Sequence, residues 1–152
     1  MAEPFDRRSL LAAVPQHAPF RFIDEIVEVD DQHIVGAYRF REDEFFYSGH
    51  FPGHPITPGV ILIETMAQTG VVALGLYLAS LSEDTARAGF TTLFTETSVE
   101  FGAIVNPGDR VTVHAQKIYF RRRKLKVRAQ MSLADGSAAC WGELAGMGVR
   151  LP

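Results

Sequence analysis

The chain has 152 residues, 47% of them hydrophobic, which suits one globular domain with a substantial core. Its formal net charge of −3 gives no indication of a nucleic-acid-binding protein. Cys140 is the only cysteine, which excludes an internal disulfide and a cysteine-rich metal site and is typical of a reducing compartment. The first residues are charged and lack the apolar stretch of a signal peptide, so we expect a cytoplasmic protein with a single domain over residues 1–152.

The first predicted elements are a short helix and a β-hairpin. A helical turn is expected over residues 6–13, before a break at Pro15 and Pro19. Residues 22–29 are typical of a strand, and residues 33–40 of its antiparallel partner across a polar turn. The segment that follows, residues 42–58, contains two Gly, three Pro and four aromatic side chains. It is too irregular for a helix or strand and too aromatic for a simple linker, so we predict a functional loop.

A long apolar helix is predicted after this loop. Thr57 offers a hydroxyl for the N-cap, Pro58 suits the first helical position, and the helix should continue to about Ser80. Glu64 is its only charged residue, so the segment is long and apolar enough to span a bilayer. However, a charge at the centre of the bilayer costs roughly 3 kcal/mol, and the rest of the chain predicts strands. We therefore expect a helix buried on all sides in a protein that does not enter a membrane.

Four strands are predicted after a linker over residues 82–89, namely residues 90–101, 110–120, 125–133 and 138–149. Turn sequences at residues 106–109 and 134–136 precede the second and fourth of them. Two strands, one apolar helix and four strands are most simply combined in an antiparallel sheet curled around the helix, the α+β arrangement called the hot-dog fold. Because the sheet covers only part of the helix and leaves edges open, we expect at least a homodimer.

Two residues near the start of the long helix predict acid–base chemistry. His50 lies in the aromatic loop, and because histidine titrates near neutral pH, its neutral form can accept a proton. Glu64 follows two turns into the helix among Ile, Leu and Met residues. Burial there should raise the pKa of the carboxyl and keep it protonated, so that it can donate a proton. A base and an acid at one dry cavity suit the elimination of water.

The start of the helix also predicts a binding site for a carbonyl oxygen. The amides of Gly59 and Val60 lie at the positive end of the helix dipole, where they could polarise a thioester and stabilise an enolate-like charge. Because Gly59 has no side chain, an acyl chain could approach its backbone closely. We assign Phe51 to the same substrate-binding set. The aromatic residues of the loop are equally consistent with a tunnel wall and with the core; they are Phe45, Phe46, Tyr47 and Phe51.

Residues 49–68 resemble the signature of the 3-hydroxyacyl-acyl-carrier-protein dehydratases of bacterial type II fatty-acid synthesis, in particular the FabZ type. The similarity extends over most of the chain and includes residues 14–15, 19–20, 24, 99–101 and 107–109. The resemblance implies that His50 and Glu64 are the catalytic pair and that Gly59 supplies the carbonyl-polarising amide. A Glu at position 64 is similar to the FabZ type, whereas the FabA type usually has Asp there.

The resemblance further implies how the pair works. His50 would remove the α-proton and Glu64 would protonate the departing 3-hydroxyl, without a metal or redox cofactor. The two would meet across a dimer interface, and the dimers would assemble into a trimer of dimers. The acyl chain would enter an apolar tunnel on the phosphopantetheine of an acyl carrier protein. The basic run at residues 121–124 suits the docking of such an acidic carrier, although strand edges also carry basic residues to resist pairing.

This chain departs from the family pattern at two places. Gln16 occupies a position that is usually His, and Gly102 and Ala103 replace a basic pair. The departures leave the catalytic pair unchanged. The second one concerns carrier docking or the tunnel wall, and so leaves both primary fatty-acid synthesis and a related lipid pathway consistent with the sequence.

Two other functions are weighed against the dehydratase. An acyl thioesterase of the same fold would need a carboxylate or an activated water aimed at the carbonyl carbon, and a non-catalytic acyl-thioester-binding protein would be expected to lack His50 or Glu64. The presence of both at the family spacing favours the dehydratase. His54 lies near His50, but no third residue has ligand spacing, so no metal site is expected. The remaining histidines are interpreted as structural or exposed; they are His17, His33 and His114.

Overall fold

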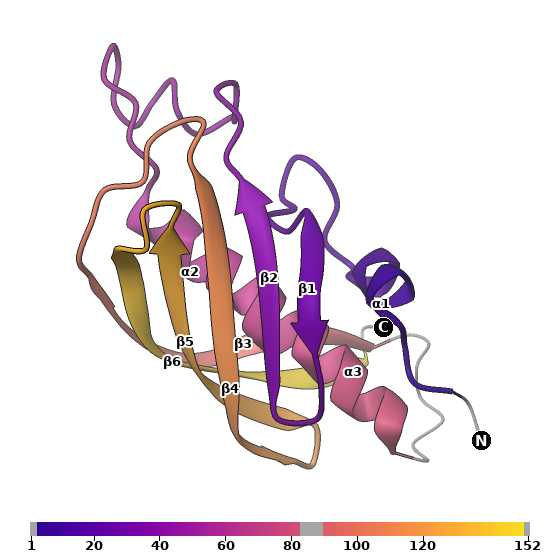
Figure 1. Ribbon diagram of the computed structural model, residues 1–152. Helices are drawn as coiled ribbons and strands as arrows, with labels where there is room; N and C mark the ends of the chain where they lie inside the picture. The colour runs from indigo at the N-terminus through magenta and orange to yellow at the C-terminus, as the bar shows by residue number, and fades with distance from the viewer. Residues whose placement is uncertain (1–2, 83–89, 151–152) are drawn as a thin grey trace.

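A computed structural model describes residues 3–82 and 90–150 as a six-stranded antiparallel sheet curled around one long helix (Figure 1). The elements are α1 (Arg7–Ala13), β1 (Glu25–Val29), β2 (His33–Arg39), α2 (Gly59–Ala67), a π-helical turn η1 (Gln68–Ala73), α3 (Leu74–Leu81), β3 (Phe90–Phe101), β4 (Arg110–Arg121), β5 (Lys124–Leu133) and β6 (Ala138–Arg150). This confirms the predicted element order and the hot-dog fold. The predicted linker over residues 82–89 lies almost wholly outside the described residues.

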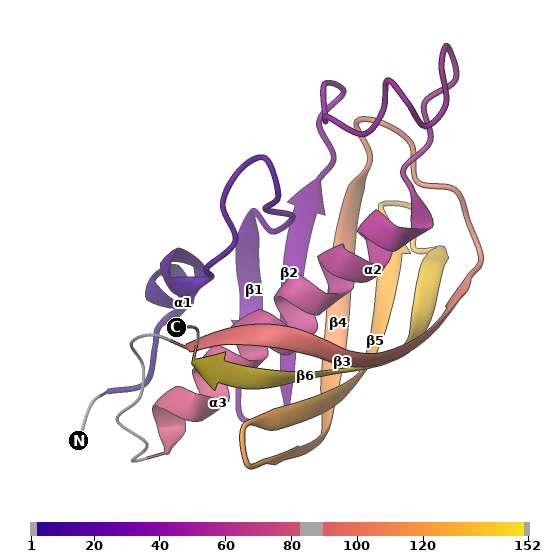
Figure 2. The same cartoon turned by 180° about the vertical axis from the view of Figure 1, so that it is seen from behind.

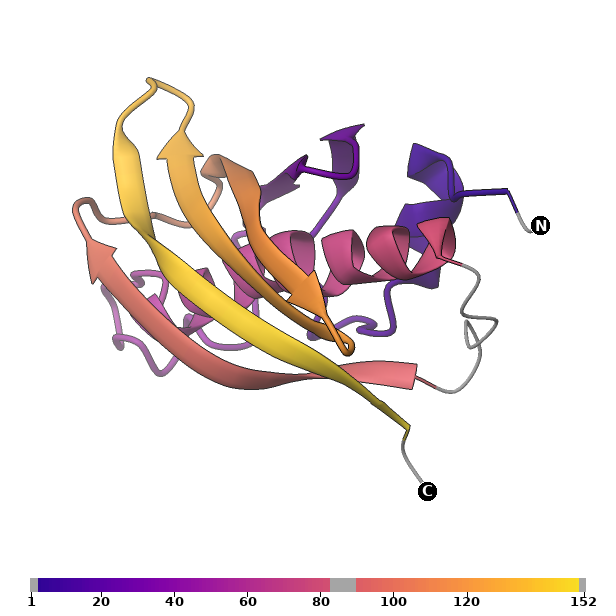
Figure 3. The same ribbon diagram turned by 90° about the horizontal axis from the view of Figure 1, so that it is seen from below.

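The sheet has the strand order β1-β2-β4-β5-β6-β3, and all neighbours are antiparallel. Seen from below, it bends from β1 round to β3 beneath the helix (Figure 3). Register shifts in four of the five pairings provide bulges, which increase strand twist and favour this curl. Alternate residues of the two central strands belong to the core, as the period of two predicts; they are Val111, Val113, Ala115, Leu125, Val127, Ala129 and Met131.

The two edges of the sheet differ. β1 is covered by α1, and the Arg7 guanidinium donates a hydrogen bond of 2.6 Å to the Val27 carbonyl. β3 is twelve residues long and, within the described part of the chain, pairs only with β6. Its free edge exposes a row of backbone donors and acceptors. Leu93 and Phe94 on this strand are 49% and 43% exposed. The free β3 edge is therefore unpaired and carries these two exposed apolar side chains.

The central helix runs without interruption from Gly59 to Leu81. By length and composition it could cross a bilayer, but 67% of its most apolar window is buried inside the protein, as in a core helix. The expected burial on all sides is wrong at its first turns. Figure 2 shows α2 in front of the sheet, and Val60 is 72% exposed. One side of α2 is therefore left uncovered by this chain.

Three details differ from the sequence prediction because side chains compete for backbone or cap positions. β1 begins at Glu25 rather than residue 22, since the N–H of Phe22 donates to the Gln68 side chain instead of to a strand. The predicted Thr57 cap is wrong: Pro58 occupies the N-cap position, and the Thr57 hydroxyl pairs with the Tyr47 hydroxyl at 2.7 Å. The middle of the helix is π-helical rather than α-helical.

Gly70 lies within this π-helical turn, close to β4. A methyl group at Gly70 would lie 2.9 Å from the Ala115 side chain, closer than carbon atoms normally approach. The bare backbone therefore lets η1 press against β4. The π-helical turn also begins at Gln68, a buried polar residue four positions after Glu64.

Candidate active site

The loop between β2 and α2 projects beyond the strand ends at the top of Figure 1. It is anchored in an aromatic cluster, in which neighbouring ring centroids lie between 4.7 and 6.5 Å apart; its members are Phe22, Tyr38, Phe40, Phe46 and Tyr47. The Tyr47 carbonyl accepts from the N–H of His50 at 3.3 Å, and the His50 carbonyl accepts from the N–H of Ile56 at 2.9 Å. These contacts fix the backbone of His50 to the core.

The environment of His50 determines which ring nitrogen can act as a base. Nδ1 lies 2.9 Å from the Ile56 carbonyl oxygen, which can only accept a hydrogen bond. In the neutral imidazole the proton is therefore on Nδ1, and Nε2 carries the lone pair. The Phe51 ring stacks on the imidazole with centroids 4.1 Å apart and so fixes the plane of the ring. In the neutral form of His50, Nε2 is therefore the ring nitrogen that is able to accept a proton.

Glu64 lies in the first turns of α2, in a half-buried position between the buried residues Leu62 and Met66. Burial raises the pKa of its carboxyl, as the sequence predicts, and a hydrogen bond from Gln68 partly opposes this shift. The bond joins Gln68 Nε2 to Glu64 Oε1 at 3.0 Å. No ion pair involves Glu64 in the described part of the chain. A carboxyl without a cation nearby and partly removed from water is suited to donating a proton.

Gly59 and Val60 are the first residues of α2, where helix amides have no helical acceptor. The Pro58 carbonyl accepts from the N–H groups of Ile61 and Leu62, one turn later. A side chain at Gly59 would lie 3.1 Å from the ring of Phe101, which reaches over from β3. The missing side chain of Gly59 thus provides room for Phe101, a contact that the sequence did not predict.

The aromatic residues of the loop divide into two groups. Tyr47 is buried and Phe46 is largely so, and both belong to the aromatic cluster. Phe45 and Phe51 are 55% and 51% exposed. The exposed apolar side chains of this region are therefore Phe45 and Phe51 of the loop, Val60 of α2, and Phe101, which lies over Gly59.

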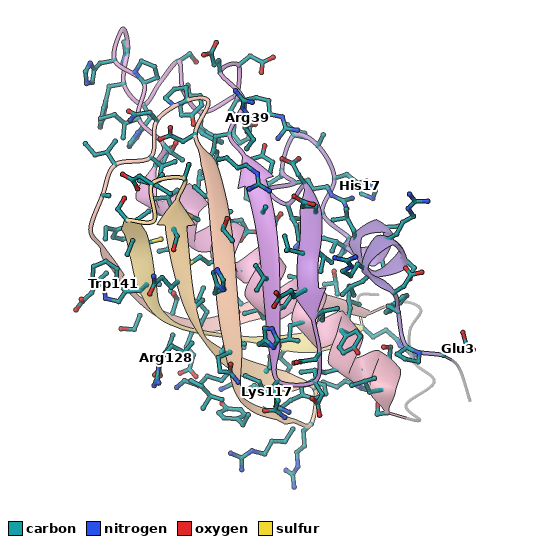
Figure 4. All side chains as sticks on the ribbon, in the orientation of Figure 1. Glu3, His17, Arg39, Lys117, Arg128 and Trp141 are labelled. Carbon is teal, nitrogen blue, oxygen red and sulfur yellow. The ribbon has the colours of Figure 1, made fainter. Side chains whose placement is uncertain are left out.

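No hydrogen bond or ion pair joins His50 and Glu64 among the contacts of the described residues. The side chain of His54 is exposed, and its backbone forms a reciprocal hydrogen-bond pair with Phe51 that closes the tip of the loop. In residues 3–82 and 90–150, no three His, Cys, Asp or Glu side chains are arranged to hold a metal ion. His17 lies beside α1 and not in this loop (Figure 4).

Two further contacts were missed by sequence reasoning. Gln68 is fully buried and binds Glu64; the signal was a primary amide four residues after a carboxyl in an apolar helix. Gly102 stands at the first position of the family's basic pair. The ring of Trp141 in β6 explains the glycine, because a side chain at Gly102 would lie 2.7 Å from that ring. Trp141 and Arg128 lie at the outer surface of the sheet (Figure 4).

Known proteins are similar to this chain in sequence over most of its length. The model of the FabA-like domain family matches residues 14–143. The 3-hydroxyacyl-acyl-carrier-protein dehydratase FabZ of Brucella ovis is 36% identical over 147 residues, covering 95% of this chain and 89% of that protein. The protein of the same name from Caldicellulosiruptor saccharolyticus is 33% identical over 142 residues, covering 92% and 96%.

Two solved structures show the same fold. The dehydratase heterocomplex ApeI:P from Xenorhabdus doucetiae has a TM-score of 0.73 at 15% identity, covering 96% of this chain and 93% of that one. A mutant thioesterase from Pseudomonas aeruginosa has a TM-score of 0.68 at 19% identity, covering 98% and 97%. Because dehydratases and thioesterases share the fold, the sequence match decides between them. On the extent of that match, the chain belongs to the FabA-like family, alongside the FabZ dehydratases.

Proposed function

We propose that this protein removes water from a (3R)-3-hydroxyacyl-acyl-carrier-protein to give the trans-2-enoyl product, with His50 as base and Glu64 as acid. Membership of the FabA-like family and identity to FabZ dehydratases support the activity. The main support for the residue roles is the half-buried Glu64 carboxyl, whose pKa is raised by burial. The contact of His50 Nδ1 with the Ile56 carbonyl, which leaves Nε2 free to act as the base, supports the role of His50. We place the whole chain, as one domain, in cytoplasmic type II fatty-acid synthesis or a related lipid pathway.

The reaction follows from the two protonation states. Nε2 of His50 takes a proton from C2 of the acyl chain while the amides of Gly59 and Val60 stabilise the charge on the thioester oxygen. The C2–C3 double bond forms as the C3–O bond breaks, and Glu64 gives its proton to the departing hydroxyl, which leaves as water. Transfer of the proton from His50 back to Glu64 resets the pair. The reverse sequence hydrates an enoyl thioester.

Hydration of crotonyl-carrier protein tests the function directly, because loss of the enoyl absorbance reports the reaction. A dehydratase consumes the enoyl group and leaves the thioester intact. An acyl thioesterase instead releases a free thiol, and a non-catalytic binder changes neither signal. Inactivity on carrier-bound and coenzyme A substrates of several lengths would contradict the proposal.

The site is proposed to form between two copies of the chain. No hydrogen bond joins His50 and Glu64 within the described part of one chain, and one side of α2 remains uncovered. The free β3 edge offers a twelve-residue strand for antiparallel pairing with the same strand of a second copy. Pairing there would bury Leu93 and Phe94. We propose this homodimer as the active unit, with one residue of each catalytic pair from each subunit.

The reaction rate is expected to have a bell-shaped pH dependence. It falls at low pH because protonated His50 can no longer accept the C2 proton. It falls at high pH because Glu64 ionises, and the raised pKa of this carboxyl moves that limb upward from the range of an ordinary glutamate. Initial rates on crotonyl-carrier protein should show both limbs, and the residual activity of Glu64→Gln should lack the basic one. A flat profile from about pH 5 to 9 would contradict the assigned roles.

The turn between β4 and β5 is proposed to dock the acidic carrier protein. Arg122 and Arg123 form its two central residues with φ of 51° and 64°, a conformation that favours Asn-Gly and is costly for arginine. Both arginines also line an apolar cavity of about 600 Å³ next to α3. The positive φ of these two arginines costs backbone energy, which suggests that their side chains have a function. Basic side chains beside an apolar cavity suit the recognition of an anionic partner that carries an acyl chain.

Replacing this turn by Asn-Gly separates docking from folding. The double variant Arg122→Asn/Arg123→Gly should gain about 1 kcal/mol of stability in thermal unfolding, because its residues adopt positive φ at lower cost. The same variant should lose about tenfold in kcat/KM on carrier-bound substrate but not on the coenzyme A thioester. Arg128→Gln, which removes one exposed cation from β5, is the matched control. Equal losses on both substrates would exclude carrier docking by this turn.

A further inference from the structure

Gln68 is completely buried, and all of its hydrogen-bonding groups face fixed partners. Its Oε1 accepts from the N–H of Phe22 at 2.7 Å. Its Nε2 donates to the carbonyl of Phe20 at 3.1 Å and to Glu64 Oε1 at 3.0 Å. A buried primary amide with three such partners has a single low-energy orientation.

The orientation of the Gln68 amide follows from its backbone partners. The N–H of Phe22 can only donate, so it requires the Gln68 oxygen; the carbonyl of Phe20 can only accept, so it requires the nitrogen. A flipped amide would oppose donor to donor and acceptor to acceptor. The group that faces Glu64 is therefore always an N–H. Gln68 can donate to the carboxyl but cannot accept a proton from it.

We propose that Gln68 is a positioning residue that holds Glu64 by Oε1 and thereby makes Oε2 the oxygen that carries and delivers the proton. This inference rests on the proposed role of Glu64 as the acid. A carboxyl oxygen that accepts an N–H hydrogen bond is the carbonyl-like oxygen of the protonated group, so the O–H is placed on the other one. The bond persists after proton transfer, when Oε1 belongs to a carboxylate.

The same hydrogen bond sets how readily Glu64 releases its proton. Burial raises the pKa of the carboxyl most, and the Gln68 bond lowers it, because an N–H donor stabilises the ionised form more than the neutral one. No charged group contributes to this shift, either from α2 or from the elements packed against it. Among the residues that the structure describes, Gln68 is thus the single polar contact that opposes the effect of burial on the pKa of Glu64.

Gln68 is held by two residues, Phe20 and Phe22, that pack against each other. Phe20 and Phe22 lie 46 to 48 residues away in sequence, and their rings pack edge to face at 5.1 Å. Phe22 belongs to the aromatic cluster that also anchors the His50 loop. Glu64 is therefore fixed through Gln68 to the cluster that fixes His50 of the same chain. In the proposed dimer, each cluster would position one residue of both active sites.

Nuclear magnetic resonance tests the pairing in the unaltered protein without any need for turnover. The side-chain NH₂ resonances of Gln68, assigned through their through-bond correlations to the Gln68 backbone, should shift with pH at the pKa of the Glu64 carboxyl. They should lose that titration in Glu64→Gln. Gln68 resonances that do not respond to pH while the Glu64 carboxyl titrates would overturn the proposal, even if the protein proves to have another activity.

Kinetics then separate positioning from simple packing. Gln68→Met keeps the length of the side chain and removes its hydrogen bonds, so the basic limb of the pH profile should move upward by about one unit and kcat should fall about tenfold at unchanged KM. Thr65→Val is the matched control, since Thr65 is equally buried and its hydroxyl donates only to the Ile61 carbonyl; it should leave the limb in place. A uniform loss of rate without movement of the limb would assign Gln68 a purely structural role. If Gln68→Met does not fold, the resonance titration decides alone.

Discussion

His50→Ala and Glu64→Gln are each expected to reduce turnover of crotonyl-carrier protein at least about a hundredfold, because each removes one of two proton transfers. Without the His50 imidazole, no base is available for the C2 proton. Without the Glu64 carboxyl, the hydroxyl must leave without a proton from the enzyme. The Gln variant keeps the shape of Glu64, so its loss measures the missing proton and not a cavity. Steady-state enoyl absorbance gives both values.

The matched control for His50→Ala is His54→Ala. His54 lies in the same loop, its side chain is exposed, and its two hydrogen bonds to Phe51 are made by the backbone. This variant should keep most of the activity. Thermal unfolding of all three variants tests whether the loop and helix stay folded. If either catalytic variant keeps wild-type rates while folded, that residue does not belong to the pair.

Mixing the two inactive variants should restore activity if each site takes His50 from one subunit and Glu64 from the other. In a heterodimer of His50→Ala and Glu64→Gln chains, one site lacks both groups and the other has both. Random pairing makes about half of the dimers heterodimers, so about a quarter of all sites should be active. Starting from two nearly inactive proteins, this is a large gain. Co-expression with two different affinity tags isolates the heterodimer for measurement.

Two comparisons make this result decisive. Each tagged variant paired with itself must stay inactive, and a heterodimer of His50→Ala with the double variant His50→Ala/Glu64→Gln must also stay inactive. If His50 and Glu64 of one chain form the site, the mixed dimer gains nothing. If the isolated heterodimer has about half of the wild-type rate, the shared site is established.

Local sequence patterns predicted the elements well, because their causes are local. Alternating apolar residues gave the strands, and the turn at Gly136 has the positive φ of 88° that its sequence indicates. The failures all involve distant partners. The start of β1 depends on the hydrogen bond between the Phe22 N–H and Gln68, which are 46 residues apart. The helix cap depends on the hydrogen bond between the hydroxyls of Tyr47 and Thr57. No window of neighbouring residues contains that information.

The candidate site shows the same division between local and distant causes. His50, Glu64 and Gly59 stand in one continuous segment whose residue types and spacing carry the resemblance, so they could be named from the sequence. The tautomer of His50 depends on its contact with the Ile56 carbonyl. The hydrogen bond from Gln68 that holds Glu64 depends on the conformation of a second segment, residues 20–22, because that segment orients the Gln68 amide. The close approach of Phe101 to Gly59 required the curl of the sheet.

The free β3 edge has a further consequence for the newly made chain. Before the proposed dimer forms, the monomer exposes a strand rich in Thr and Phe with unsatisfied backbone groups along its length. Such an edge can pair with any other extended chain, so it is a starting point for aggregation. Dimerisation competes with aggregation for the same edge, and both depend on concentration. Protomers made close together, for example on one messenger RNA, would find the correct partner before a wrong one.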